Sequence, residues 1–216
     1  MVSFLNQLKS QANAIQAETR AQQTEKDECT KLTEGAARTA WLYLAELVKQ
    51  LDVIEPDGPA LTLDGKTPWP RMKMVNFRID SRKKILRDKE VFDYIAMSWQ
   101  IVPHEGEQIN GSVSANFLPE MKRIEDRLFF GFVKHDKVDV RDPEKNTLKE
   151  FRFDYKTQAR AGITVTANHD ESRLDFRLAN LQGFQISTPS YSASEIQTPL
   201  LDELAKLILG QASRFV

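Results

Sequence analysis

The feature that most constrains the fold is a change in the spacing of apolar residues along the chain. Before residue 52 apolar residues recur three and four positions apart, and after residue 71 they alternate with polar residues. The first spacing is typical of amphipathic helices, and the second is typical of antiparallel strands with one buried face. The chain is therefore expected to be an α+β protein in which a helical N-terminal part precedes a sheet.

The alternating stretches predict individual strands. They are residues 108–118, EFRFDYK (150–156), AGITVTAN (161–168) and RLDFRLA (173–179). Segments 91–102 and 128–134 are apolar on both faces, which indicates central strands. Short turn-rich connections such as RDPEKNT (141–147) favour hairpins. We expect a largely antiparallel β-meander of roughly seven to nine strands, flanked by N-terminal helices and a C-terminal helix.

Turn residues suggest how the chain is divided. Residues 1–52 form an N-terminal helical segment of one helix or two, residues 53–70 a connecting loop, and residues 71–216 the sheet with its covering helix, together one compact domain. The C-terminal helix has clear boundary signals, since Thr198 is a suitable N-cap, Pro199 suits the first turn and Gly210 suits the end. This helix is expected to cover the apolar face of the sheet.

The composition excludes several classes of protein. The 216 residues carry a net charge of −1, contain one cysteine, Cys29, and include no apolar run long enough for a membrane span. A single cysteine excludes an internal disulfide and fits a reducing compartment. The N-terminus lacks the features of a signal peptide. We expect a cytoplasmic protein with no membrane association.

One stretch resembles the end of a phosphate-binding P-loop. The sequence ALTLDGKTPWP (60–70) contains Gly-Lys-Thr, but Ala60 stands where the motif requires its first glycine. Pro68 and Pro70 follow where a helix should begin, and they remove two amide donors. The segment is predicted to be an exposed connecting loop, and no nucleotide or other cofactor is expected.

No residues form a recognisable catalytic or metal-binding pattern. His104, His135 and His169 lie in three separate predicted turns, and their spacing matches no common metal site. Asp154 and Lys156 project from one strand face and, with Asp142, resemble the arrangement of a metal-dependent nuclease. Such two-residue coincidences are common, so we assign no catalytic and no metal-binding residue.

The charge is unevenly distributed along the chain. Segment 71–89 contains eight cations and two carboxylates, which leaves the rest of the chain at −7. These cations could bind phosphates, with Trp69 stacking on a base, or a protein partner; alternatively Lys83 and Lys84 protect an exposed sheet edge. The candidate partner- or nucleic-acid-binding residues are Trp69, Arg71, Lys73, Arg78, Arg82, Lys83, Lys84 and Arg87.

The N-terminal segment carries a short apolar seam at coiled-coil spacing, formed by Leu5, Leu8, Ala12 and Ile15. It indicates either an oligomerisation arm or, slightly favoured, a helix lying on its own domain.

The preferred interpretation of the whole chain is a non-enzymatic cytoplasmic protein-binding or assembly module with a protein partner or self-association. The alternative is a nucleic-acid-binding protein, less plausibly a metal-dependent nuclease. A small-molecule cavity beside a Ser/Asn/Thr-lined strand face is left open, since it depends on how the sheet curves.

Overall fold

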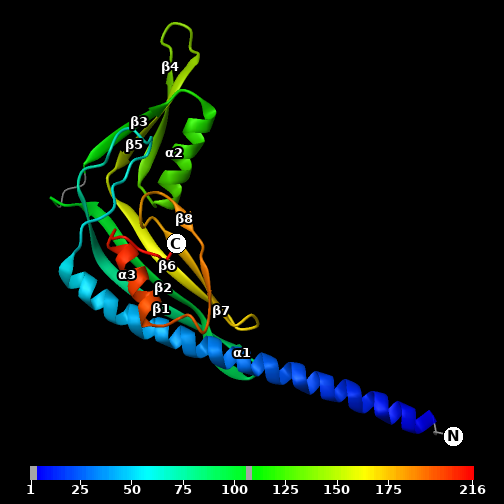
Figure 1. The fold of residues 1–216 in the computed structure, drawn as a ribbon. Helices are drawn as coiled ribbons and strands as arrows, with labels where there is room; N and C mark the ends of the chain where they lie inside the picture. Colours follow the sequence, from blue (N-terminus) through cyan, green and yellow to red (C-terminus); the bar gives the residue numbers. More distant parts are fainter. Residues whose placement is uncertain (1–3, 106–108) are drawn as a thin grey trace.

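A single helix forms the whole N-terminal quarter of the chain. The computed structural model describes residues 4–105 and 109–216 and shows α1 (Phe4–Ile54) as one continuous helix of 51 residues. No proline occurs before Pro56, and Glu55 takes a positive φ of 45° directly after the helix ends. The choice between one helix and two is thus settled as one (Figure 1). Among the described residues, none of the helices is long and apolar enough to cross a bilayer.

Six strands form a large antiparallel sheet beside α1. Its order is β1 (Met72–Leu86), β2 (Lys89–Pro103), β6 (Ala159–Asn168) and β7 (Arg173–Ala179), and β7 also pairs with the short β8 (Ile186–Ser187) and β9 (Ser190–Ser192). The central position predicted for segment 91–102 is confirmed, since β2 lies between β1 and β6. The alternating segments 161–168 and 173–179 are β6 and β7 as predicted.

The remaining strands form a second, smaller sheet. Its order is β3 (Asn110–Ala115), β5 (Leu148–Lys156) and β4 (His135–Arg141), all antiparallel, and the β4–β5 hairpin projects from the body (Figure 1). The strand predicted within residues 108–118 corresponds to β3, with Gln108 outside the described residues. The predicted α+β class and antiparallel pairing are confirmed, with the strands divided between two sheets.

One predicted strand is wrong. Residues 128–134 are the end of α2 (Leu118–Phe130) and the turn that follows. Met121, Ile124 and Leu128 lie three and four positions apart and face the core, and Pro119 occupies the first turn, where its missing amide donor costs nothing. The helical spacing of apolar residues continues from Met121 into the apolar run, so the start of that run is helical and not a strand.

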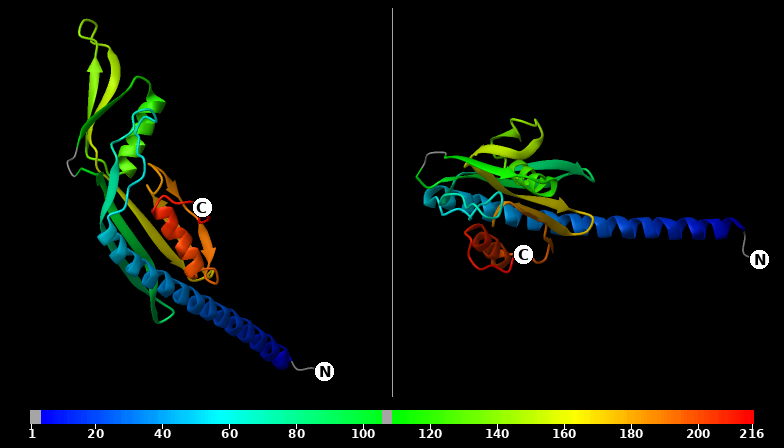
Figure 2. Two further views of the ribbon diagram at one scale, coloured as in Figure 1. Left: turned by 60° about the vertical axis from the view of Figure 1, so that its left-hand side comes forward. Right: turned by 90° about the horizontal axis from the view of Figure 1, so that it is seen from above.

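Two helices cover the same face of the large sheet. α3 (Thr198–Ile208) packs beside α1, and the Tyr43 hydroxyl of α1 donates a 2.6 Å hydrogen bond to Asp202 of α3 (Figure 2). The N-cap of α3 is Gln197, without a side-chain cap, so the prediction of Thr198 as the cap is wrong. The fully buried side chains beneath the helices include Trp99, Ile163, Phe176, Leu44, Leu201, Leu204 and Phe215.

The connecting loop between α1 and β1 contributes to the core. Leu61, Leu63 and Trp69 are each at most 7% exposed, so the prediction of an exposed loop is wrong for these side chains. They belong to one continuous set of buried residues that extends from the large sheet to Phe153 of the small sheet and Ile124 of α2. The turn-rich sequence thus forms a loop that packs inward between the two sheets.

Candidate functional site

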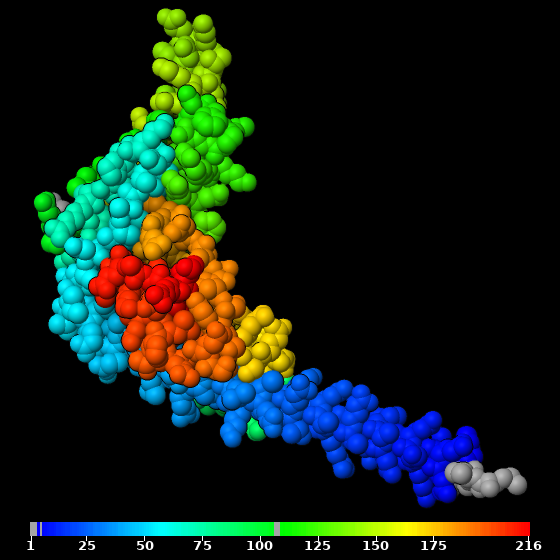
Figure 3. All heavy atoms as spheres, in the orientation of Figure 1, coloured from blue at the N-terminus to red at the C-terminus, as the bar shows by residue number. Residues whose placement is uncertain are grey.

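The first part of α1 leaves the body of the molecule (Figure 3). In residues 4–26 every side chain that the structure describes is exposed, and burial begins at Asp27 and Thr30. At 1.5 Å per residue this segment is about 35 Å long. We call residues 4–26 the arm. The slightly favoured prediction, a helix lying on its own domain, is wrong for the arm and holds only for the later part of α1.

Large apolar side chains on the arm are exposed to solvent. Phe4, Leu8 and Ile15 are 73%, 46% and 64% exposed, and Ala12 is exposed as well. The side chain of Leu5 lies outside the described residues. Phe4 is absent from the predicted seam, although its position four residues before Leu8 is a helical spacing that could have identified it.

The exposed stripe continues the face that α1 buries against its own sheet. At about 100° per residue, Phe4, Leu8 and Ile15 lie within about 40° of Ala40 around the helix axis. Ala40 is fully buried. The exposed stripe and the buried face therefore lie on the same side of α1, separated along it by the polar residues Thr19, Gln22 and Lys26. The large sheet covers only the C-terminal part of that side.

Polar contacts mark the point at which the arm leaves the body. Arg87, in the β1–β2 turn, donates to the carbonyl of Lys26 at 3.3 Å and to the hydroxyl of Thr30, and forms an ion pair with Asp170. Further along α1, the carboxylate of Glu34 accepts the amide of Phe92 at 2.9 Å. These contacts fix α1 on the sheet beside the residues where burial begins.

Most cations of the predicted basic segment have carboxylate partners. Asp93 of β2 lies 3.0 Å from Lys84 and 4.0 Å from Arg82, and Glu90 lies 2.9 Å from Lys83. The other pairs are Arg71 with Asp57, Lys73 with Glu55 and Arg87 with Asp170. Of the eight cations in segment 71–89, only Arg78 and Lys89 form no ion pair with a described residue. The net charge of +6 is thus offset by acidic residues from other segments.

Trp69 cannot stack on a nucleic acid base in this structure. It is 7% exposed, its ring stacks on Tyr155 at 5.5 Å between centroids, and it meets the edge of Phe184 at 5.3 Å. The binding of a nucleic acid by residues 71–89 stays a prediction, without Trp69 as its stacking residue. β1 lies at the edge of the large sheet, which agrees with edge protection by Lys83 and Lys84.

The loop that resembles a P-loop binds its own carboxylate. The amides of Lys66 and Thr67 donate to Asp64 at 2.8 and 2.7 Å, and the hydroxyls of Thr62 and Thr67 add bonds of 3.1 and 2.9 Å. Burial raises the pKa of Asp64, but these hydrogen bonds outweigh it and lower the pKa to about 2. The amides that would have to bind a phosphate are therefore already occupied.

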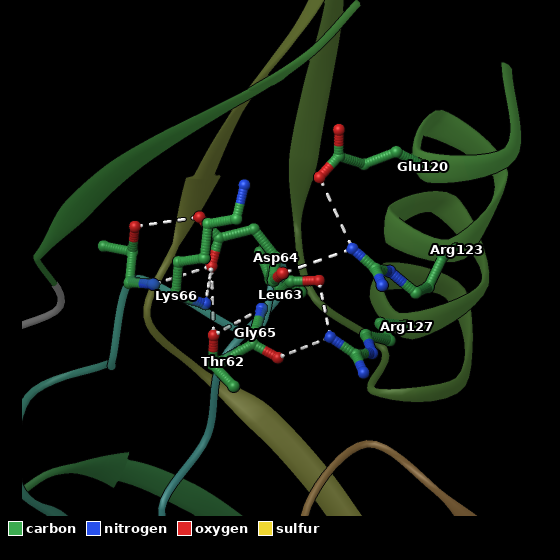
Figure 4. Close-up of polar contacts among 9 residues, drawn as sticks. Thr62, Leu63, Asp64, Gly65, Lys66, Glu120, Arg123 and Arg127 are labelled. Carbon is green, nitrogen blue, oxygen red and sulfur yellow. Dashed lines mark hydrogen bonds and ion pairs between the residues drawn. The ribbon is translucent and has the colours of Figure 1, made fainter. Parts of the chain in front are cut away.

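Arginines of α2 hold this loop from outside (Figure 4). Arg127 donates to the carbonyl of Leu63 at 2.8 Å, and Arg123 donates to the carbonyl of Asp64 at 3.2 Å and pairs with Glu120. The arginines bind backbone carbonyls, so this cluster connects the loop to α2. Neither arginine is evident as a loop contact from the sequence, because residues 62–64 and 123–127 lie some 60 positions apart.

The nuclease-like residues do not assemble. Asp154 and Lys156 share a strand face of β5, but Asp142 lies in the β4–β5 turn, about 20 Å along the strand, where it accepts the amides of Glu144 and Lys145. The residue opposite Asp154 is Asp136. Within residues 4–105 and 109–216 no three His, Cys, Asp or Glu residues converge as metal ligands.

The three histidines have separate surroundings. The Nε2 atom of buried His169 lies 2.7 Å from the carbonyl of Phe92, and Nδ1 of His135 lies 2.9 Å from the carbonyl of Val133. The side chain of His104 is half exposed, and its Nε2 atom lies 3.9 Å from a carboxylate oxygen of Asp57.

Comparisons with protein-family models, curated proteins and solved structures find no match to this chain. The arm is the surface whose geometry favours a function.

Proposed function

We propose that the protein is a non-enzymatic assembly module of the cytoplasm, and that its arm pairs with the arm of a second copy. The observation that carries this proposal is a helix of 23 residues that extends from the body with its apolar stripe in water. The cytoplasmic setting rests on the single cysteine, Cys29.

A helix that packs against nothing has little to stabilise it in water. In proteins most of the stability of a helix comes from tertiary packing of its amphipathic face. The arm contains many Gln, Asn, Ser and Thr residues and no packed face of its own. Pairing would bury Phe4, Leu8 and Ile15, and each fully buried side chain of this size contributes about 1.5–3 kcal/mol.

The position of the body favours an antiparallel pair. The apolar stripe of the arm lies on the side of α1 that the large sheet covers further along, so a parallel partner would bring its own body against this sheet. In an antiparallel pair the two bodies lie at opposite ends. If Leu8 of each copy lies opposite Ile15 of the other, the pair buries Leu8 and Ile15 of both arms.

The test compares two double variants of the full chain by light scattering after size exclusion. Leu8→Lys with Ile15→Lys places two charges on the stripe, whereas Asn6→Lys with Asn13→Lys places two charges with the same spacing on the opposite side of the arm. We expect the wild type and the Asn variant to have twice the 24.7 kDa mass of one chain. The stripe variant is expected to be a monomer with an unchanged thermal unfolding of the body.

Two outcomes would contradict this proposal. One is a wild-type mass of 24.7 kDa over the micromolar to millimolar range. The other is an equal loss of association in both variants, which would show that added charge, and not the stripe, determines the effect. A wild-type chain that stays monomeric but co-purifies with a different protein in an Ile15-dependent way would reassign the arm to that protein.

A further inference from the structure

A cavity lies on the face of the large sheet turned away from α1 and α3. It has a volume of about 350 Å³ and is bounded by β2, β6, β7 and the segment at the end of α2. It is separate from the arm and from the loop at Asp64. Cavities of this size are at the lower end of the range for small-molecule sites.

Small side chains form the floor of the cavity. Ala96 and Ser98 of β2 lie beside Gly162 and Thr164 of β6, in register across the two strands. A Cβ atom on Gly162 would lie 2.8 Å from the carbonyl oxygen of Met97, so no side chain fits there without a shift of β2. The floor is therefore hollow because the strands approach closely at a glycine.

Aromatic rings at the end of α2 form one wall. Phe129, Phe130 and Phe132 are 73%, 40% and 72% exposed, although they line a cavity. Two contacts fix this wall on the sheet: the amide of Arg160 donates to the carbonyl of Gly131 at 2.8 Å, and Asn180 donates to the carbonyl of Phe130 at 2.9 Å. The backbone that carries the exposed rings is thus held against the sheet.

Asn180 is a buried polar residue with an unused acceptor. It is 1% exposed, lines the cavity and donates from Nδ2 also to the carbonyl of Arg160 at 2.8 Å. Its Oδ1 atom has no hydrogen-bond partner among the described residues.

The charge lining the cavity is entirely positive. Arg160 and Arg177 line it, no carboxylate does, and neither arginine forms an ion pair with a residue that the structure describes. The guanidinium of Arg160 lies 5.9 Å from the centre of the Phe132 ring. Arg177 is opposite Thr164, so the two arginines are about 13 Å apart along the strands and flank the hollow floor.

We propose that this cavity binds a small carboxylate that carries an aromatic or aliphatic body. The body would lie on the small-residue floor against the phenylalanine rings, and the carboxylate would accept hydrogen bonds from a guanidinium. Arginine suits this role because its planar donors match the two carboxylate oxygens. The positive lining selects an anion over a neutral or cationic molecule of the same shape.

The test uses 4-phenylbutyrate as the probe, with 4-phenylbutanol and 4-phenylbutylamine as molecules of matched shape. Amide chemical shifts are followed by NMR on the full chain during titration. We expect the carboxylate to shift the amides of Gly131 and Gly162 and to bind at least about tenfold more tightly than the alcohol or amine. The change Arg160→Gln with Arg177→Gln should weaken binding by at least about tenfold, because the charged hydrogen bonds are lost.

Arg38→Gln is the control, because Arg38 of α1 is also exposed and forms no ion pair with a described residue but lies on the other side of the large sheet. It should leave binding unchanged. Three results would overturn the proposal: no shift of these amides at 10 mM probe (about the weakest binding of interest), equal binding of the alcohol, or equal weakening by Arg38→Gln and the double variant. Preserved dispersion of the remaining amide signals shows that each variant is folded.

Discussion

At the scale of single residues, the burial of Trp69 shows why the exposure of a side chain could not be predicted from the residues around it in the sequence. An aromatic residue beside a basic stretch suggests a stacking platform, but Trp69 packs on Tyr155 and Phe184, which lie 86 and 115 positions further along the chain. Likewise the carboxylates that pair with the basic segment come from the loop after α1, from β2 and from the β6–β7 turn. Local sequence shows the charge of a segment but not the partners that the fold brings to it.

Asp64 provides a prediction at this scale. Replacement by Ala leaves two amides and two hydroxyls without their acceptor, and we expect a loss of about 1–3 kcal/mol in the free energy of unfolding. Asp64→Asn should lose less, because the amide oxygen still accepts. Urea unfolding followed by circular dichroism measures both.

The pH dependence of Asp64 follows from its lowered pKa. Its carboxylate stabilises the folded state fully above its ordinary pKa of 3.8, and this contribution is lost as pH falls through the folded-state pKa of about 2. Between pH 4 and pH 2 the wild type should therefore lose more stability than Asp64→Asn. Parallel stability curves for the two proteins in this range would contradict the assigned hydrogen bonds.

At the scale of elements, period and turn residues predicted most of the structure. The alternation of apolar and polar residues predicted the positions of β5, β6 and β7, and the helical spacing before residue 52 corresponds to α1. The exception, α2, ends in the apolar run LFFGFV, which is too short to show a helical period by itself. The division into two sheets depends on contacts between distant strands, such as β3 with β5, and the sequence pattern does not contain them.

The two parts of α1 should respond differently to change. Deleting residues 1–23 removes no buried side chain that the structure describes and keeps Lys26 and Thr30, which contact Arg87. We expect the midpoint of thermal unfolding of the body to move by no more than a few degrees. Leu44→Ala, within the packed part, should cost about 2–5 kcal/mol.

Differential scanning calorimetry at low protein concentration separates these cases, since association through the arm then contributes least. A deletion that unfolds the body as Leu44→Ala does would show that the arm supports the fold. In that case its exposed stripe would need a structural explanation instead of a functional one.

At the scale of the whole molecule, the net charge of −1 places no strong repulsion between two copies. The sequence contained the seam but could not show that the body leaves it uncovered, because that depends on where the sheet ends along α1. It likewise left open a cavity beside a polar strand face but could not show its aromatic wall, which comes from the end of the helix that the pattern missed.

The most direct test of the association uses the only cysteine. Cys29 lies just beyond the arm and is partly exposed, so a spin label there reports the distance between two copies by double electron–electron resonance. Antiparallel arms with Leu8 opposite Ile15 place the two labelled residues about 50 Å apart at 1.5 Å per residue. Antiparallel pairing predicts a distribution centred near that distance, which is lost in Leu8→Lys with Ile15→Lys. A signal without dipolar modulation would contradict it, and so would a distribution below roughly 20 Å, since parallel helices in contact lie about 10 Å apart.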